Sequence, residues 1–204
     1  MQFSEELKRL IESHPDIIDL IEKRDIETLY KRLLGGEYFT YLNYDASDNC
    51  ISEVYYLLME LGINPLEYLT KMPKNIIWGM SANQLVIPSN IVDIRPLAIS
   101  ESRINTIIIE SYKINIDDKL WLNNTQINNL ICNSAYIRFT YKNDKLADFL
   151  DSTVNTVFAT ERPTYSVKFT FKKNARVYQD NAYRSIRKII QDEQLDKKFD
   201  ITLV

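Results

Sequence analysis

The first part of the chain carries apolar side chains at the three- and four-residue spacing of amphipathic helices. Leu7, Leu10 and Ile11 form the first stripe, and Pro15 suits the first turn of a second helix. A third helix is expected to end at Gly35, because glycine favours the end of a helix. The expected helix caps are Ser4, Asp25, and Asp48 or Asn49 for a fourth helix. This spacing predicts a compact helical bundle before Pro73.

After Pro73 the helical spacing gives way to alternation, and one hexapeptide pattern recurs. Its copies begin 22, 23 and 27 residues apart: ANQLVI at 82–87, INTIII at 104–109, INNLIC at 127–132 and VNTVFA at 154–159. Asparagine takes the second place in every copy, and apolar residues take the fourth and sixth places. Alternation of this kind is typical of a strand with one buried face. Between copies, IVDI at 91–94 and KINI at 113–116 form a partial echo.

A period of about 20 to 29 residues with a short strand in each copy is typical of a leucine-rich-repeat solenoid. Stacking explains the fixed distance, because each coil needs that length of chain to return to the sheet. We therefore predict an α+β fold, in which an N-terminal helical bundle caps a short leucine-rich-repeat-like solenoid of about four coils. The predicted domains are a helical cap at 1–75, the solenoid at 76–160 and a strand–helix–strand C-terminal cap at 161–204.

The C-terminal cap is predicted from three segments. YSVKFTFKK at 165–173 alternates strictly and reads as a half-buried strand. Asp180 or Asn181 is expected to cap a following helix, and FDITLV at 199–204 is expected to be the last strand. Such a unit would cover the open end of a sheet, which otherwise invites pairing with other chains.

The run LVIPSNIVDIRPLAISESRINTIIIE carries a family resemblance. Ile87-Pro88, Ile94 and Ala98 stand where the BspA-type leucine-rich repeat has its Ile-Pro turn, its second strand and its Ala-centred segment. The preceding ELGINPLEYLTKMPKNIIWGM resembles the helical lead-in to such repeats in uncharacterised bacteriophage proteins. The resemblance covers roughly residues 52–132. It implies a protein that recognises a partner and a phage or mobile-element origin, and it implies no particular chemistry.

Composition narrows the class of protein. The chain has 204 residues, 45% of them hydrophobic and 26% charged, with a formal net charge of −3, as in an ordinary globular protein. Its apolar runs span about six residues, far short of the roughly 20 that cross a bilayer. The N-terminus lacks the pattern of a secretory signal. We therefore expect a cytoplasmic protein in which Cys50 and Cys132 are small buried residues rather than a disulfide.

Positive charge gathers near the C-terminus. Residues through Leu130 include 12 basic and 19 acidic side chains, whereas the remainder includes 13 basic and 9 acidic ones. Arg162 and a cluster within 168–188 interleave with Tyr165, Tyr178 and Tyr183. Such a pattern suits a nucleic acid, an acidic protein partner, or a solvated face without a ligand. The candidate binding residues are Lys168, Lys172, Lys173, Arg176, Arg184, Arg187 and Lys188.

The chain lacks the residues that most common catalytic sites require. His14 is the only histidine, so metal sites built on two histidines are excluded, and no glycine-rich phosphate loop is present. NYDASDN at 43–49 lacks the glycine and the final glutamate of a calcium loop. Asp117-Asp118 could be proposed as paired carboxylates, but helix capping or a loop explains them better. We expect a protein that is not an enzyme and that holds no cofactor or metal.

The sequence therefore predicts a non-catalytic protein-interaction module that binds a host or viral protein through the repeat surface. The candidate contact residues are Asn83, Asn105, Asn128, Asn155 and Trp121. The asparagines could instead satisfy backbone groups between coils, and Trp121 could fill the core. The alternatives are a nucleic-acid-binding protein that uses the basic C-terminal face and a structural component of a virion.

Overall fold

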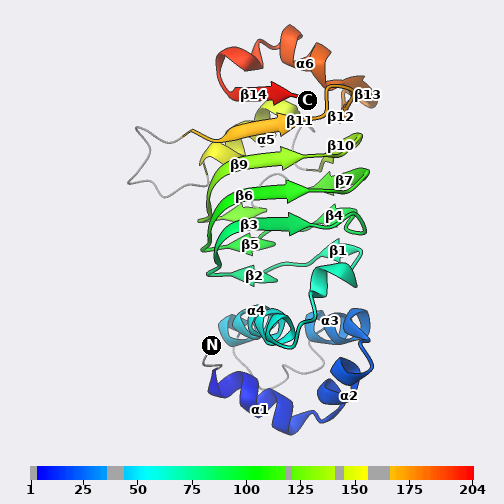
Figure 1. The fold of residues 1–204 in the computed structure, drawn as a ribbon, viewed down its shortest axis with the longest axis vertical. Helices are drawn as coiled ribbons and strands as arrows, with labels where there is room; N and C mark the ends of the chain where they lie inside the picture. The colour runs from blue at the N-terminus through cyan, green and yellow to red at the C-terminus, as the bar shows by residue number, and fades with distance from the viewer. Residues whose placement is uncertain (1–3, 36–43, 118–120, 141–144, 156–165) are drawn as a thin grey trace.

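The computed structural model describes residues 4–35, 44–117, 121–140, 145–155 and 166–204, without the side chains of 44–49. Helices gather at one end of the molecule, sheets occupy its middle, and a short helical segment covers the other end (Figure 1). The helices are α1 (Glu5–Ser13), α2 (Asp16–Glu22), α3 (Ile26–Leu34), α4 (Tyr44–Glu60), α5 (Leu146–Asn155) and α6 (Ile186–Asp192), with 3-10 turns η1 (Pro65–Glu67) and η2 (Leu195–Lys197).

The N-terminal helices begin where their capping side chains predict, with one exception. Ser4 accepts a hydrogen bond from a first-turn backbone N–H of α1 at 3.1 Å, and Asp25 does so for α3 at 3.2 Å, so both caps are confirmed. The cap predicted at Asp48 or Asn49 is wrong, because α4 already begins at Tyr44. The helix therefore begins before the predicted cap, and among the side chains described its buried residues start at Cys50 and Ile51.

Three sheets form the middle of the molecule (Figure 1). The six-stranded sheet runs in the order β1 (Lys71–Met72), β4 (Asp93–Ile94), β7 (Lys113–Ile116), β10 (Tyr136–Phe139), β12 (Arg176–Gln179) and β13 (Ala182–Ser185). The five-stranded sheet runs β14 (Asp200–Leu203), β11 (Lys168–Phe171), β9 (Gln126–Cys132), β6 (Arg103–Ile109) and β3 (Ser81–Ile87). The three-stranded sheet runs β2 (Ile77–Trp78), β5 (Ile99–Ser100) and β8 (Leu122–Asn123).

Each of the first three passes of the chain supplies one strand to each sheet. β1, β2 and β3 form the first pass, β4 to β6 the second, and β7 to β9 the third. All neighbours from successive passes pair in parallel, and the β12–β13 hairpin is the antiparallel pair. Leu85 pairs with Ile107 and Ile107 with Leu130, so the register expected from the first three hexapeptides is confirmed.

The predicted fold class is wrong. The described residues form an α/β fold with three sheets of mostly parallel strands and six α-helices, which is not a helical bundle capping a solenoid. The hexapeptide pattern predicts one strand per repeat, and the resemblance adds a second one at Ile94, but no third strand is predicted among the apolar residues between hexapeptides. Those residues form two further strands per pass, as β4 and β5 do before β6. Parallel strands buried on their inner faces therefore replace the expected loops.

The strand expected at 154–159 is also corrected. Val154 and Asn155 close α5, and residues 156–159 lie outside the described ranges. The buried face of α5 has helical spacing, and it consists of Leu146, Phe149, Leu150 and Thr153. The place of a fourth strand beside β9 is taken by β11, where Phe169 pairs with Leu130.

The C-terminal segment differs from the predicted strand–helix–strand cap, because the hairpin strands β12 and β13 lie between β11 and α6. The expected strands are present as β11 and β14, which pair in parallel. Asp180 and Asn181 do not cap a helix, since both have positive φ angles, 53° and 62°, and lie at the tip of the β12–β13 hairpin. Two consecutive left-handed residues are what a tight hairpin turn needs, and Asp and Asn tolerate them. The helix α6 starts six residues after Asp180, with Ser185 as its N-terminal flanking residue.

The core runs through all three sheets. Trp121 and Phe149 stack with ring centroids 6.1 Å apart, and Phe149 stacks on Phe139 at 4.3 Å, so α5 closes the space beside the three-stranded sheet. Cys50 and Cys132 are free and buried, which confirms the interpretation of both as small buried residues.

Candidate functional site

β3 is the longest strand that lies at the edge of a sheet. It has seven residues, whereas the edge strands of the other sheets have two to four. Within the described part of the chain, no strand pairs with the side of β3 that faces away from β6. In a parallel strand the backbone N–H and C=O groups alternate between two sides, so part of this backbone faces the open side. Its sequence SANQLVI has no charge and no proline, the residues that usually protect an edge.

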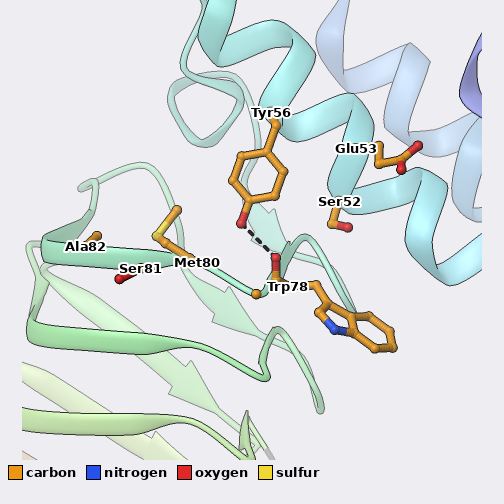
Figure 2. A pocket seen from close by; sticks show the side chains of 8 residues that line it. Ser52, Glu53, Tyr56, Trp78, Met80, Ser81 and Ala82 are labelled. Carbon is orange, nitrogen blue, oxygen red and sulfur yellow. Dashed lines mark hydrogen bonds between the residues drawn. The ribbon is translucent and has the colours of Figure 1, made fainter. Parts of the chain in front are cut away.

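Helix α4 holds the turn before β3 but leaves the strand itself uncovered. The Tyr56 hydroxyl on α4 donates a hydrogen bond to the carbonyl oxygen of Trp78 at 2.8 Å (Figure 2). Gly79 follows with a φ of 67°, a backbone conformation that a residue with a Cβ adopts only with strain. The chain therefore turns away from α4 as β3 begins, and a space remains between the helix and the first residues of the strand.

This space is a pocket of about 510 Å³, which we call the edge pocket (Figure 2). One wall comes from side chains on one face of α4, and the other comes from the turn and the first residues of β3. The lining residues are Ser52, Glu53, Tyr56, Trp78, Gly79, Met80, Ser81 and Ala82. The pocket opens beside the free backbone of β3, so the two features form one continuous site.

The edge pocket combines apolar walls with one carboxylate. Tyr56, Trp78 and Met80 are the large apolar side chains of the lining, and each is partly exposed. Glu53 is the ionisable acid of the lining, and its Oε2 accepts a hydrogen bond from the Ser4 hydroxyl at 2.7 Å. This bond ties the start of α1 to α4 and orients the carboxylate. A ligand with an apolar group and an adjacent positive charge would match this lining.

Burial gives the tyrosines at this site a distinctive response to pH. It raises the pKa of Tyr55 and of Tyr56 from 10.0 to about 12, because the phenolate would lose its hydration. Between pH 10 and pH 12 the unfolded chain therefore binds fewer protons than the folded one, and stability falls as pH rises. Below pH 10 both states keep the neutral phenols, and this contribution to stability is fully present.

We expect the midpoint of urea unfolding to fall as pH rises through this window. The Tyr55→Phe/Tyr56→Phe double variant is expected to lose less stability over the same window, although it starts lower because the bond to Trp78 is gone. Parallel urea titrations of both proteins on either side of pH 10 measure the difference. Equal losses in the two proteins would contradict the assignment to these two phenols.

Three of the four candidate asparagines form a ladder on the outer face of the five-stranded sheet. The amide nitrogen of Asn105 donates to the side-chain oxygen of Asn83 at 3.1 Å, and that of Asn128 donates to Asn105 at 2.8 Å. The amide groups thus satisfy one another and stabilise neighbouring strands. Asn155 lies apart from them at the end of α5. Trp121 is 1% exposed, so it fills the core and does not contact a partner from the surface.

The basic candidates do not form one patch. Lys168 lies on β11 and Arg176 on β12, which belong to different sheets, and Lys172 and Lys173 lie at the corner between these strands. Arg187 and Lys188 are exposed on α6. Tyr165 and Arg162 lie outside the described ranges.

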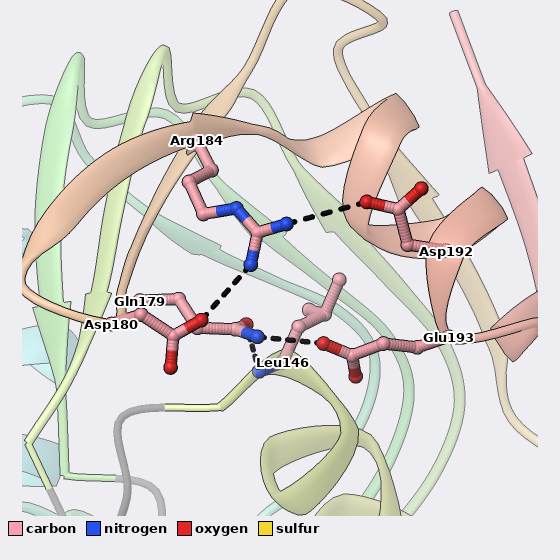
Figure 3. Close-up of polar contacts among 6 residues, drawn as sticks. All are labelled: Leu146, Gln179, Asp180, Arg184, Asp192 and Glu193. Atoms are coloured by element: carbon pink, nitrogen blue, oxygen red, sulfur yellow. Dashed lines mark hydrogen bonds and ion pairs between the residues drawn. The ribbon is translucent and has the colours of Figure 1, made fainter.

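Arg184 forms ion pairs with two carboxylates of the same chain. It bonds to Asp180 at 2.9 Å and to Asp192 at 3.3 Å, beside a bond of 2.6 Å from the Gln179 amide to Glu193 (Figure 3). These contacts tie the β12–β13 hairpin to α6. Arg184 is therefore better placed to hold the C-terminal segment together than to bind a ligand.

The residues considered for catalysis or metal binding belong to different parts of the chain. His14 follows α1 as its C-terminal flanking residue, Asp117 follows β7, and Asp118 lies outside the described ranges. Within the described ranges, no three His, Cys, Asp or Glu side chains gather as a metal site would require. None of the helices described is long and apolar enough to cross a bilayer.

Comparisons of the chain with protein-family models, curated proteins and solved structures gave no match. The resemblance to BspA-type repeats therefore stays a prediction.

Ser52, Glu53 and Tyr56 could not be predicted as site residues from the sequence, because their spacing fits an ordinary helix face. One signal was available: ANQLVI is the first copy of the hexapeptide, and the first strand of a stack must lie at an edge.

Proposed function

We propose that this protein is a non-catalytic interaction module that binds an extended peptide segment of a partner protein at β3. The observation that carries the proposal is the continuity of an uncharged, unpaired seven-residue edge with the edge pocket. An extended peptide can add a strand to such an edge, where main-chain hydrogen bonds supply affinity and a side-chain pocket supplies specificity.

The lining of the edge pocket indicates which side chains the peptide would carry. Its volume of about 510 Å³ accepts a large apolar side chain, which Tyr56 and Met80 would contact. Glu53 favours a lysine or arginine next to that anchor in the peptide sequence. Burying such an anchor contributes about 1.5–3 kcal/mol, so removing its contacts is expected to weaken binding roughly tenfold or more.

A peptide fits this site better than a second copy of the same chain. Two β3 edges pairing with each other would bring no large apolar anchor for the pocket, since the exposed side chains of β3 are Ser81, Asn83, Gln84 and Val86. The two Glu53 carboxylates would also gain no positive partner from β3, because this strand carries no charge.

The test is selection of a displayed library of random linear peptides on the purified protein, followed by titration of the selected peptides by calorimetry. We expect enrichment of sequences with an aromatic or large aliphatic residue beside a basic one. Met80→Ala removes part of the pocket wall, and Gln84→Lys places a charge on the edge. Each is expected to weaken binding about tenfold. Thr202→Lys, on the opposite edge strand β14, is the matched control and is expected to bind normally.

Three outcomes would contradict the proposal. The first is the absence of any enriched motif, and the second is an equal loss of affinity in Thr202→Lys and Gln84→Lys. The third is a dimer of the protein in light scattering that Gln84→Lys converts to monomer, because it would show that β3 pairs with itself.

A further inference from the structure

The outer face of the six-stranded sheet carries four tyrosine rings in mutual contact, which we call the tyrosine row. Tyr136 lies on β10, Tyr178 on β12 and Tyr183 on β13, and Tyr112 directly precedes β7. Ring centroids are 5.6 Å apart for Tyr112 and Tyr136, 5.2 Å for Tyr136 and Tyr183, and 5.3 Å for Tyr178 and Tyr183. Packing against the core does not require this arrangement, because the residues that face the core are their strand neighbours such as Ile137 and Val177.

Three cationic side chains lie among these rings. The register places Lys113 on one side of Tyr136 and Arg176 on the other. Arg138 lies beside Tyr178, and its guanidinium carbon is 4.6 Å from the centre of that ring. All three side chains are exposed, and none of the ion pairs between described residues involves them.

The described acidic residues near this face include Glu110, which lies two residues before Tyr112 and accepts a hydrogen bond from the Asn133 amide at 3.1 Å. Asp93 on β4 contacts Arg95 at 3.2 Å, and Asp180 contacts Arg184 at 2.9 Å. Asp117 follows the last residue of β7. Lys113, Arg138 and Arg176 therefore place positive charge directly among the rings, although the whole chain has a formal charge of −3.

We propose that the tyrosine row and its three cations bind single-stranded nucleic acid. Unpaired bases stack on aromatic rings, and the phosphates between them need positive charges at short intervals, which is the alternation found here. Tyr112 is 69% exposed and offers the most accessible ring. A duplex hides the faces of its bases, and an acidic protein would use the cations but not the rings. This site lies on a different sheet from β3, so the proposal is independent of peptide binding.

The arrangement predicts how salt affects affinity. Three phosphate contacts on a single strand give a slope of about −2 when log affinity is plotted against log salt concentration. Affinity is therefore expected to fall about twentyfold between about 50 mM and 200 mM salt. Arg138→Ala is expected to reduce the steepness of the slope by about 0.7, because one phosphate contact is lost.

The experiment is fluorescence anisotropy with labelled oligothymidylate and oligouridylate of about 12 nucleotides, a length within the site sizes of such surfaces. A duplex of the same length and polyglutamate serve as competitors. We expect single strands to bind and both competitors to displace them poorly. The deoxy and ribo strands show whether the 2′-hydroxyl matters. Tyr112→Ala is expected to weaken binding about fivefold or more, and Tyr112→Trp is expected to restore it, since stacking needs a ring.

Arg103→Ala is the matched control. Arg103 is an exposed arginine on β6 in the five-stranded sheet, so its loss changes the net charge equally without touching the tyrosine row. Thermal unfolding of every variant by circular dichroism verifies that the fold is kept.

The proposal is overturned if no single strand binds at the lower salt concentration, or if the duplex competes as well as the single strand. Equal losses in Arg103→Ala and Arg138→Ala would reduce the binding to a general charge effect and would also overturn it. Strong displacement by polyglutamate, unaffected by Tyr112→Ala, would identify an acidic protein as the ligand instead.

Discussion

Replacing Ile107 with aspartate is expected to unfold the protein, whereas the same change at the next residue, Ile108, is expected to leave it folded. Ile107 is 0% exposed and lies in the middle of β6, between Leu85 and Leu130 of the neighbouring strands. A carboxylate there would be buried without a partner, and the isoleucine contacts would be lost. Together these effects cost at least about 5 kcal/mol, which is comparable to the whole stability of a typical domain.

Ile108 is the internal control for this prediction. Its side chain points to the outer face, between Val86 and Ile131, and is partly exposed. Aspartate there keeps its water, so we expect a loss of about 1 kcal/mol from reduced strand propensity and lost contacts. Circular dichroism and urea unfolding of the two variants measure the contrast. Equal destabilisation by the two variants would mean that the inner and outer faces of β6 are assigned wrongly.

Replacing Phe149 with alanine is expected to lower the free energy of unfolding by about 3–5 kcal/mol. The Phe149 ring is 1% exposed and stacks on both Phe139 and Trp121. It therefore joins α5 to β10 of the six-stranded sheet and to Trp121, which directly precedes β8 of the three-stranded sheet. Its removal leaves a cavity between two other large rings, which cannot collapse without moving their strands.

The control is Phe199→Ala, which removes the same side chain from a partly exposed position. Phe199 contacts Phe169 edge to face at 6.3 Å near the C-terminal end of the molecule. We expect a loss of roughly 1–2 kcal/mol there, because less apolar area leaves the core. Urea unfolding curves of both variants give the two values. A loss at Phe149 no greater than that at Phe199 would contradict the role given to α5.

The sequence predicted those parts of the fold in which a local pattern has one physical meaning. Leu85, Ile107 and Leu130 hold the same place in a pattern that recurs at 22- and 23-residue intervals, so only a stacked register buries all three. The hexapeptide at 154–159 matched the same letters, but the helical spacing of Leu146 and Phe149 before it determined the structure at Val154 and Asn155. Burying the apolar face of a ten-residue helix stabilises the fold more than a short strand that matches the hexapeptide would.

Asp180 and Asn181 show a second reason why the sequence did not predict part of the fold. Both residue types favour helix caps and also tight turns, because their short polar side chains satisfy nearby backbone groups in either setting. Pairing between β12 and β13 determines that these two residues form a hairpin turn. The same two strands contain part of the basic and aromatic pattern that suggested a ligand. A helix cap and a hairpin turn are therefore not distinguishable from the two residues alone.

The sites were harder to predict than the fold because they join distant residues. Arg138 lies over Tyr178, 40 positions later in the chain, and Tyr56 bonds to Trp78, 22 positions later. The basic and aromatic residues of 168–188 could be noticed as a cluster, but Tyr112, Lys113, Tyr136 and Arg138 reach the same face only through the parallel register. Composition left a nucleic acid, an acidic protein and a solvated face open, whereas the strand pairing shows which basic and aromatic residues share one face.

The direction of the backbone hydrogen bonds has a mechanical consequence. The two chain ends lie at opposite ends of the stack of strands, and the bonds between strands run roughly along the line that joins them (Figure 1). A force that pulls the termini apart would stretch these bonds and load them one strand at a time. The molecule would then peel open from one end at low force, as a zipper does, in steps set by the length of a single pass.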